Sequence, residues 1–273
     1  MHLKPLTRLF TSSLFCLASF ANACDDIALG SITVRAPDLS HVNDAPRSNA
    51  ARARIIEAWW QQSCPEFSKI DLQTSRSDNL VCRVAGQRIE TIVIGAHYDK
   101  VQKGHGVADN WSGIVLLDSL KKHFEAKDLK YSLEFVAFAA EERDMQGAAA
   151  YLADQTHTAV AMVNLDTLGL RPMIISGESD EYLTCITSRI AEHLSVSVTV
   201  RNWSKITGDY EPFLLQGIPA IGLHSVDPTT IKRIHQRRDR RGNVDMELLK
   251  DAYRLTEKLI GRLAETGLPL SEG

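Results

Sequence analysis

Five places in the sequence combine histidine and carboxylate residues that could bind a metal and move protons. They are His97 with Asp99, then Asp109, the pair Glu141 and Glu142, Asp166, and His235. Imidazole nitrogen and carboxylate oxygen are donors that zinc takes in catalytic sites, and zinc held by them can activate water. Together the five places predict a site for a pair of zinc ions.

Each place taken alone also has a simpler structural interpretation. His97 and Asp99 would form a structural pair, Asp109 would cap a helix, and Glu141 with Glu142 would start one. Adjacent glutamates repel each other, however, unless a cation lies beside them. In the metal interpretation, Asp99 accepts the second ring N–H of His97 and so orients the ligand. The combination favours the metal site over the separate structural roles.

Most of these residues follow apolar runs that are typical of buried strands. The runs lie at 91–98, 133–139 and 160–165, and their continuous apolar character predicts strands that are covered on both faces. Open α/β sheets bind ligands beyond the carboxyl ends of their strands. We therefore expect the candidate side chains to meet at one edge of a sheet.

Helical periodicity and strand-like runs alternate along the chain, which predicts one α/β domain. We expect helices at 48–62, 112–124, 147–152 and 181–194 and a last one capped by Asp245, and further strands at 80–84, 174–175, 196–200 and 220–223. The expected architecture has three layers, with helices flanking a mixed, mostly parallel central sheet of about eight strands.

The N-terminal segment has the pattern of a secretory signal peptide. Lys4 and Arg8 precede the apolar run 9–20, which ends in small residues before Cys24. An uncleaved membrane anchor is the alternative, although the run is shorter than the roughly 20 residues of a membrane span; a lipid-modified Cys24 is another. We expect a signal peptide at 1–23, a catalytic domain at 24–273, and export to the periplasm or the medium.

Charge and cysteine content limit the partners and the compartment. The formal charge of −3 becomes −3 − 2 = −5 once Lys4 and Arg8 are removed, so a nucleic acid is not an expected partner, and the basic cluster at 232–241 lacks interleaved aromatics. The mature cysteines are Cys24, Cys64, Cys82 and Cys185. They permit two disulfides in three pairings, and no CxxC spacing suggests a cysteine zinc site.

Six motifs resemble, in order, the secreted double-zinc aminopeptidases, a family related to glutamate carboxypeptidase, glutaminyl cyclase and the transferrin receptor ectodomain. The resemblance covers most of residues 80–260. The motifs are GAHYD at 95–99, ADNWSG at 108–113, FAAEE at 138–142, NLDTLG at 164–169, GDYEPF at 208–213, and His235 with Asp239 before the last helix.

The resemblance implies a role for each candidate. His97 and Asp166 would hold one zinc ion, Glu142 and His235 the other, and Asp109 would bridge both. Glu141 would be the general base.

Two further assignments come from the same resemblance. Asp209 and Tyr210 match positions near the substrate. His224 follows the predicted strand at 220–223 and is a rival to His235 for the last ligand, but the resemblance places that ligand just before the final helix.

The resemblance implies a monomeric aminopeptidase that acts on peptides with a free N-terminus and has no stable membrane association after signal cleavage. A glutaminyl cyclase, with one zinc ion instead of two, is the first alternative, although Ile234 stands where a tryptophan is expected in a cyclase. A dicarboxylate-specific carboxypeptidase is a less favoured alternative, because such enzymes use an added domain for which this chain lacks room. A non-catalytic relative would be expected to have lost ligands, and all five are present.

Overall fold

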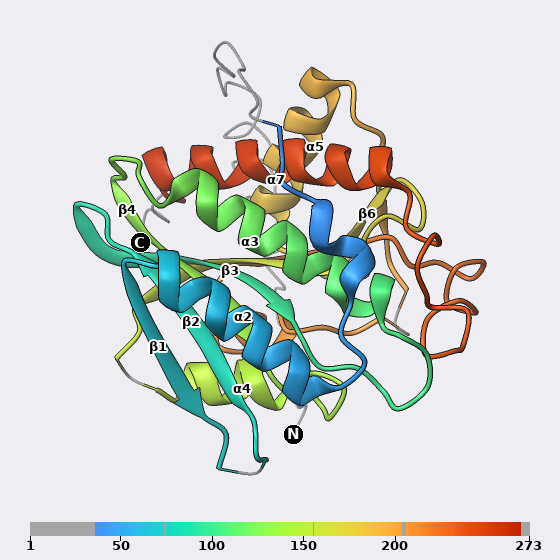
Figure 1. Ribbon diagram of the computed structural model, residues 1–273. Coiled ribbons are helices and arrows are strands. Elements are labelled where there is room, and N and C mark those ends of the chain that lie inside the picture. Colours follow the sequence, from blue (N-terminus) through green and yellow to red (C-terminus); the bar gives the residue numbers. More distant parts are fainter. Residues whose placement is uncertain (1–35, 74, 155, 204–205, 269–273) are drawn as a thin grey trace, which may run out of the picture.

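The computed structural model describes residues 36–268 except 74, 155, 204 and 205 (Figure 1). The expected signal peptide and Cys24 lie outside the described residues. Eight strands form one sheet in the order β1-β2-β4-β3-β5-β8-β6-β7. The central strands β4, β3, β5 and β8 run parallel to one another, whereas β1, β2 and β6 make antiparallel pairs.

The strands have the following bounds: β1 Glu66–Asp71, β2 Asp78–Val84, β3 Arg88–His97, β4 Tyr131–Phe138, β5 Ala159–Asp166, β6 Met173–Ser176, β7 Val198–Arg201 and β8 Ala220–His224. The helices are α2 Asn49–Ser63, α3 Ser112–Phe124, α4 Gln146–Ala153, α5 Glu181–Leu194, α6 Glu211–Leu215 and α7 Met246–Thr266, with short helical turns η1 Ser40–Asp44 and η2 Val107–Trp111. The predicted α/β class and the mixed, mostly parallel sheet are confirmed.

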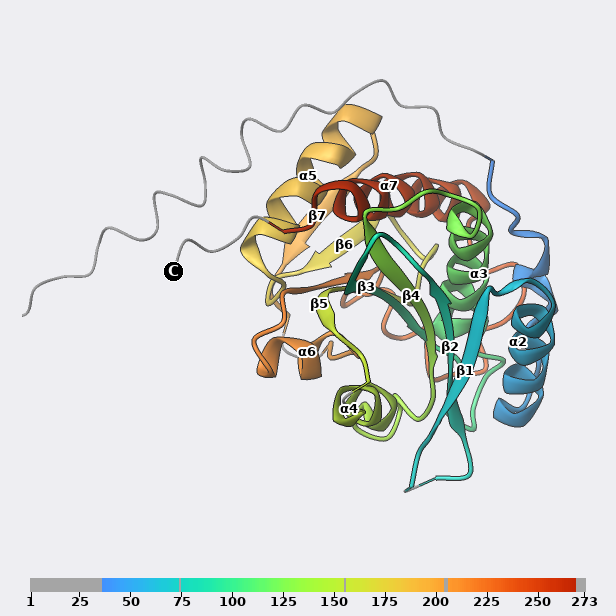
Figure 2. The same ribbon diagram turned by 90° about the vertical axis from the view of Figure 1, so that its left-hand side faces the viewer.

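Helices cover both faces of the sheet. Figure 2 shows α2, α3, α5 and α7 on one side and α4 with α6 on the other. Successive residues of a strand point to opposite faces, and accordingly Ile92 and Ile94 of β3 join the larger apolar cluster while Val93 joins the smaller one. All three side chains are fully buried. The continuous apolar run of β3 is thus explained by burial on both faces.

Helix caps lie where the sequence places them. The Ser48 hydroxyl accepts the N–H of Ala51 at 3.2 Å and begins α2. The Asp245 carboxylate accepts the N–H groups of Glu247 and Leu248 and begins α7. Such caps satisfy main-chain donors that have no partner within the helix.

A disulfide joins the end of α2 to the sheet. Cys64, which caps α2, is bonded to Cys82 of β2, and this is one of the pairings that the sequence left open. The bond fits an oxidising compartment. In the part of the chain that the structure describes, no helix is both long enough and apolar enough to cross a membrane.

Candidate active site

The candidate residues meet at the carboxyl edge of the parallel strands, as expected. His97 is the last residue of β3 and Asp166 the last residue of β5, while Glu141 and Glu142 follow β4. These three strands are neighbours in the sheet. Parallel alignment therefore brings their ends together. Asp109, in the turn before α3, and His235, in the loop before α7, complete the arrangement.

One group consists of His97, Asp109 and Asp166. The Nε2 atom of His97 lies 3.3 Å from Oδ1 of Asp109 and 3.3 Å from Oδ1 of Asp166. One nitrogen and two oxygens thus lie close enough together to hold a metal ion. All three side chains are largely withdrawn from solvent.

A second group consists of Asp109, Glu142 and His235. The Nε2 atom of His235 lies 2.8 Å from Oδ2 of Asp109 and 3.1 Å from Oε2 of Glu142. These atoms also fit a metal ion. Asp109 belongs to both groups, since its Oδ1 faces His97 and its Oδ2 faces His235. Two ions could therefore share one carboxylate.

The electrostatics of both groups fit a cation. Hydrogen bonds with Asp109 and Glu142 raise the pKa of His235 to about 10, because the two carboxylates favour positive charge beside them. Burial raises the pKa of Asp109, but hydrogen bonds from His235 and His97 outweigh it, and the net pKa lies below the ordinary value. The Oε1 atom of Glu142 is buried and has no hydrogen-bond partner among the described residues. The site supplies more negative charge than its two histidines balance.

Glu141 belongs to neither group, although it borders both. Its Oε2 lies 3.8 Å from Nε2 of His97. Burial raises the pKa of Glu141 well above its usual range; His97 opposes this rise, and Asp166 and Asp209 add to it. A carboxylate with a raised pKa that binds no metal is suited to accept a proton.

Asp99 connects the histidine to the glutamate pair. Its carboxylate accepts the main-chain N–H of Glu141 at 3.0 Å and that of Glu142 at 3.3 Å. The Nδ1 atom of His97 lies 3.1 Å from the main-chain oxygen of Asp99 and 3.6 Å from its carboxylate. The expectation was a carboxylate partner for the imidazole ring, whereas the carbonyl oxygen is the nearer acceptor. Asp99 thus positions residues of both groups.

Asp239 is a buried support that the motif analysis named without assigning a role. Its Oδ1 accepts the N–H of Val107 at 2.9 Å and that of Ala108 at 2.8 Å, and its Oδ2 accepts the N–H of Asp109 at 3.2 Å. Burial raises the pKa of Asp239 to about 6, although these main-chain donors oppose the rise. The carboxylate fixes the turn that presents the shared ligand Asp109.

Arg52 is a second support, which was not predicted from the sequence. The guanidinium is fully buried and donates to the main-chain oxygens of Tyr98, His105 and Gly106 at 3.1, 2.7 and 2.6 Å. Burial lowers its pKa to about 10, and carboxylates of the site, Asp109 first, oppose that fall. The sequence feature that could have indicated this role is the position of Arg52 one turn before Ile56, on the buried side of α2.

Two other candidates, His224 and Tyr210, belong to neither group of ligand-type residues. His224 lines the site pocket, but its Nδ1 accepts the N–H of Val226 at 3.1 Å and it belongs to neither group. The hydroxyl of Tyr210 lies 2.6 Å from Oγ of Ser176, within the smaller apolar cluster.

Asp209 is fully buried close to the site. Burial raises its pKa well above the usual range, and His97 opposes the rise. Neither of its carboxylate oxygens has a hydrogen-bond partner among the described residues. The side chain is not part of the pocket lining.

The groups open into a pocket of about 220 Å³. Ligand-type residues and Glu141 form one part of it. Apolar side chains form another, namely Met145, Ile206, Val226, Ile231 and Ile234. The apolar wall offers a surface on which the side chain of a substrate residue can pack.

Comparison with known proteins supplies the family. Residues 79–260 match peptidase family M28. A vacuolar membrane protease of Vanderwaltozyma polyspora is 29% identical over 97 residues, which cover 34% of this chain and 10% of that protein. The chain therefore spans about a tenth of the length of this curated relative.

Solved structures share the fold at low sequence identity. The LapA aminopeptidase of Legionella pneumophila has a TM-score of 0.74 at 20% identity, over 83% of this chain and 70% of that chain. BSAP, a zinc aminopeptidase from Bacillus subtilis, has a TM-score of 0.62 at 20% identity, over 71% and 51%. A glutaminyl cyclase of an Acidobacteriales bacterium has a TM-score of 0.68 at 18% identity, over 87% and 99%.

Proposed function

This chain belongs to peptidase family M28, and from that membership we propose that it is a zinc-dependent aminopeptidase that removes the N-terminal residue from peptides. The observation that carries the proposal is the sharing of Asp109 between two groups of ligand-type residues, with Glu141 beside them and outside both. This arrangement suits two metal ions and a separate proton carrier.

The proposed ligands follow the two groups. His97 and Asp166 would hold one zinc ion, Glu142 and His235 would hold the other, and Asp109 would contribute to both sites. Nitrogen and oxygen donors of this kind suit zinc, and a zinc aminopeptidase is among the proteins that share the fold. Zinc in such a site acidifies water and polarises the carbonyl group of a peptide bond.

The chain's own residues would carry out the proton transfers. Glu141 takes a proton from the attacking water and passes it to the amine that leaves. Because Glu142 is engaged with His235, its neighbour Glu141 remains free for this task. Asp99 holds the main chain of both glutamates and the ring of His97, and so fixes the distance between base and ligands.

The lining of the pocket supports binding of an N-terminal residue beside the ligands. The apolar wall formed by Met145, Ile206, Val226, Ile231 and Ile234 provides a surface for its side chain. The amino group of the substrate would lie near the carboxylates. We propose a supporting role for Asp209, whose buried carboxylate interacts electrostatically with His97 and Asp166. We propose a similar role for Tyr210, which packs against Gly222 of β8.

We further propose that residues 1–23 are a signal peptide and that 24–273 form the exported, monomeric catalytic domain, in the periplasm or the medium. The Cys64–Cys82 disulfide supports an oxidising compartment.

Mass spectrometry of peptide products tests the activity. The mature protein, with its zinc content measured, is incubated with a peptide that begins with leucine and with one that begins with glutamine. Release of the N-terminal residue from either supports the proposal. Loss of ammonia from the glutamine peptide without release of a residue would identify a cyclase instead, and bound zinc with neither product would identify a non-catalytic relative.

A further inference from the structure

The loop that carries His235 is strongly basic. Within 232–241 it contains Lys232, Arg233, Arg237, Arg238, Arg240 and Arg241, all of them exposed. The single carboxylate of this segment, Asp239, is buried and accepts three main-chain N–H groups. It therefore does not face the cations.

Most of these cations have no acidic partner in the part of the chain that the structure describes. Arg241 pairs with Asp44 at 3.3 Å. Among the described residues, no ion pair is formed by Lys232, Arg233, Arg237, Arg238 or Arg240. The sequence as a whole carries a formal charge of −3, so this basic surface is a local exception and not a reflection of overall composition.

The basic surface lies next to the proposed active site, because the same loop segment, 231–238, contributes residues to both. Ile231, Ile234 and His235 line the site pocket, whereas Lys232, Gln236, Arg237 and Arg238 line a separate hollow of about 660 Å³. Lys103, from the loop before Asp109, completes this second hollow. We call its four cations, Lys103, Lys232, Arg237 and Arg238, the cationic rim.

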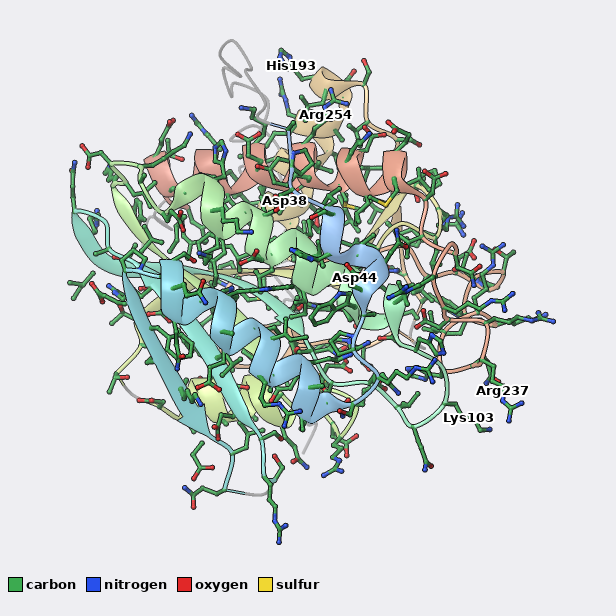
Figure 3. All side chains as sticks on the ribbon, in the orientation of Figure 1. Asp38, Asp44, Lys103, His193, Arg237 and Arg254 are labelled. Carbon is green, nitrogen blue, oxygen red and sulfur yellow. A yellow bond between two sulfur atoms is a disulfide. The ribbon has the colours of Figure 1, made fainter. Side chains whose placement is uncertain are left out.

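The two loops that form the rim are held together. The N–H of His105 donates to the main-chain oxygen of Asp239 at 2.8 Å. A Cβ atom on Gly104 would lie 2.4 Å from the main-chain oxygen of Gln236, so the close approach of the loops requires glycine there. In Figure 3, Lys103 and Arg237 both reach outward at the same lower edge of the molecule. The main-chain contacts thus keep the two loops that carry the rim side by side next to the pocket.

We propose that the cationic rim binds the part of a peptide substrate that follows the cleaved bond, and that the enzyme consequently prefers peptides with acidic residues in those positions. This inference rests on the proposed aminopeptidase function. An N-terminal residue held in the pocket leaves the rest of the peptide to emerge across the loop that contains His235. Aspartate and glutamate side chains there would meet cations that form no ion pair with any residue the structure describes.

The physical effect of exposed charges is mainly on capture. Exposed ion pairs are individually weak, but several charges of one sign beside a cleft raise the local concentration of an oppositely charged substrate and its association rate by roughly ten-fold or more. Because the Debye length is only about 8 Å at physiological ionic strength, the preference is expected to shrink as salt is added.

The test compares two peptides that share an N-terminal leucine and differ only in having two glutamates or two glutamines after it. For the zinc-loaded mature enzyme at low salt, we expect kcat/KM to be about ten-fold higher for the glutamate peptide, with most of the difference in KM. The preference should fall toward unity at about 0.5 M salt. It should also fall in the variant Arg237→Gln/Arg238→Gln, and separately in Lys103→Gln.

A matched control removes two lysines at the opposite edge of the sheet. Lys127 and Lys130 are exposed and precede the amino end of β4, so Lys127→Gln/Lys130→Gln should keep the preference. Zinc content and melting temperature verify that each variant is folded. Equal kcat/KM for the two peptides, with leucine released from both, would overturn the rim proposal and leave the aminopeptidase intact; absence of release from both would overturn the proposed function and this inference with it.

Fluorescence anisotropy with a labelled single-stranded oligonucleotide provides the other comparison. Oligonucleotide binding that depends on Arg237 and Arg238, without discrimination between the peptides, would overturn the proposal in favour of a nucleic acid ligand.

Discussion

The carboxylate of Asp99 accepts the main-chain N–H of Glu141 at 3.0 Å, and this contact ties the end of β3 to the residues that follow β4. The same carboxylate also accepts the N–H of Glu142. The proposed base and a proposed ligand are therefore positioned by a single side chain, which explains why two adjacent glutamates can be held in different environments.

Asp99→Asn should lower kcat by about 10- to 100-fold, the usual range when a group supporting metal ligands is altered. The amide keeps the size of the side chain but offers only one acceptor for two N–H groups. Steady-state kinetics on a leucyl peptide measure the loss. A variant with unchanged kcat would show that the contact does not position Glu141.

Arg52→Lys should lower the free energy of unfolding by about 2–4 kcal/mol. A lysine concentrates its donors on one nitrogen, whereas Arg52 reaches Tyr98 from Nη1 and His105 and Gly106 from Nη2. Some of these buried carbonyl groups would therefore lose their partner. Denaturant unfolding measures the change. The control is Arg54→Lys on the exposed side of α2, which should stay within about 0.5 kcal/mol of wild type; equal effects of both changes would contradict the role of Arg52.

His235 and His224 can be distinguished as ligands by zinc content. His235→Ala removes a member of the second group and should leave about one zinc per chain in place of two after gel filtration. His224→Ala should keep both ions, because the Nδ1 atom of His224 accepts the N–H of Val226 and the residue lies outside both groups. Loss of zinc from His224→Ala but not from His235→Ala would instead identify His224, at the end of β8, as the last ligand.

Glu134→Gln should reduce stability in a pH-dependent way. Glu134 is buried and bonded to Arg83, Tyr151 and His157. Although burial raises the pKa of Glu134, hydrogen bonds from His157 and Tyr151 lower it below 4.5 overall. A carboxyl whose pKa is lowered in the folded state stabilises the protein above its unfolded pKa, and that contribution is lost as the pH falls through the folded pKa.

We therefore expect Glu134→Gln to cost about 1–3 kcal/mol at pH 7 and progressively less below about pH 4.5. Urea unfolding at a series of pH values measures the difference from wild type. The comparison is Glu247→Gln at an exposed position, which should change the free energy of unfolding little at pH 7 or at low pH. If the stability difference between Glu134→Gln and wild type grew as the pH fell, the proposed role of the Glu134 carboxylate would be contradicted.

Strands and helices could be predicted from the sequence wherever burial leaves a regular pattern of apolar residues. The runs that became β3, β4 and β5 are mostly apolar because helices cover both faces of the sheet, and α3 and α5 have the predicted bounds. The strand β1 was not predicted. Its two large apolar residues, Phe67 and Ile70, are three positions apart, and it is an edge strand whose extended form depends on pairing with β2. No alternation of apolar and polar residues marks such a strand.

The candidate site divides in a similar way. Strand-end positions and motif order brought His97, Asp109 and Asp166 together in advance, and the structure places their ligand atoms side by side. Arg52 and the role of Asp239 were not predicted, because both act on main-chain groups far away in the sequence. A hydrogen bond to a main-chain atom depends on the fold, and residue spacing carries no trace of it.

If Glu141 transfers the proton while other residues hold the metal, the variant Glu141→Gln should separate the two roles. The glutamine keeps the size of the side chain and removes its basicity. We expect a zinc content equal to that of wild type, together with a fall in kcat on a leucyl peptide of at least about 10²-fold. Wild-type kcat in a zinc-loaded Glu141→Gln enzyme would contradict the proposed proton transfer by Glu141.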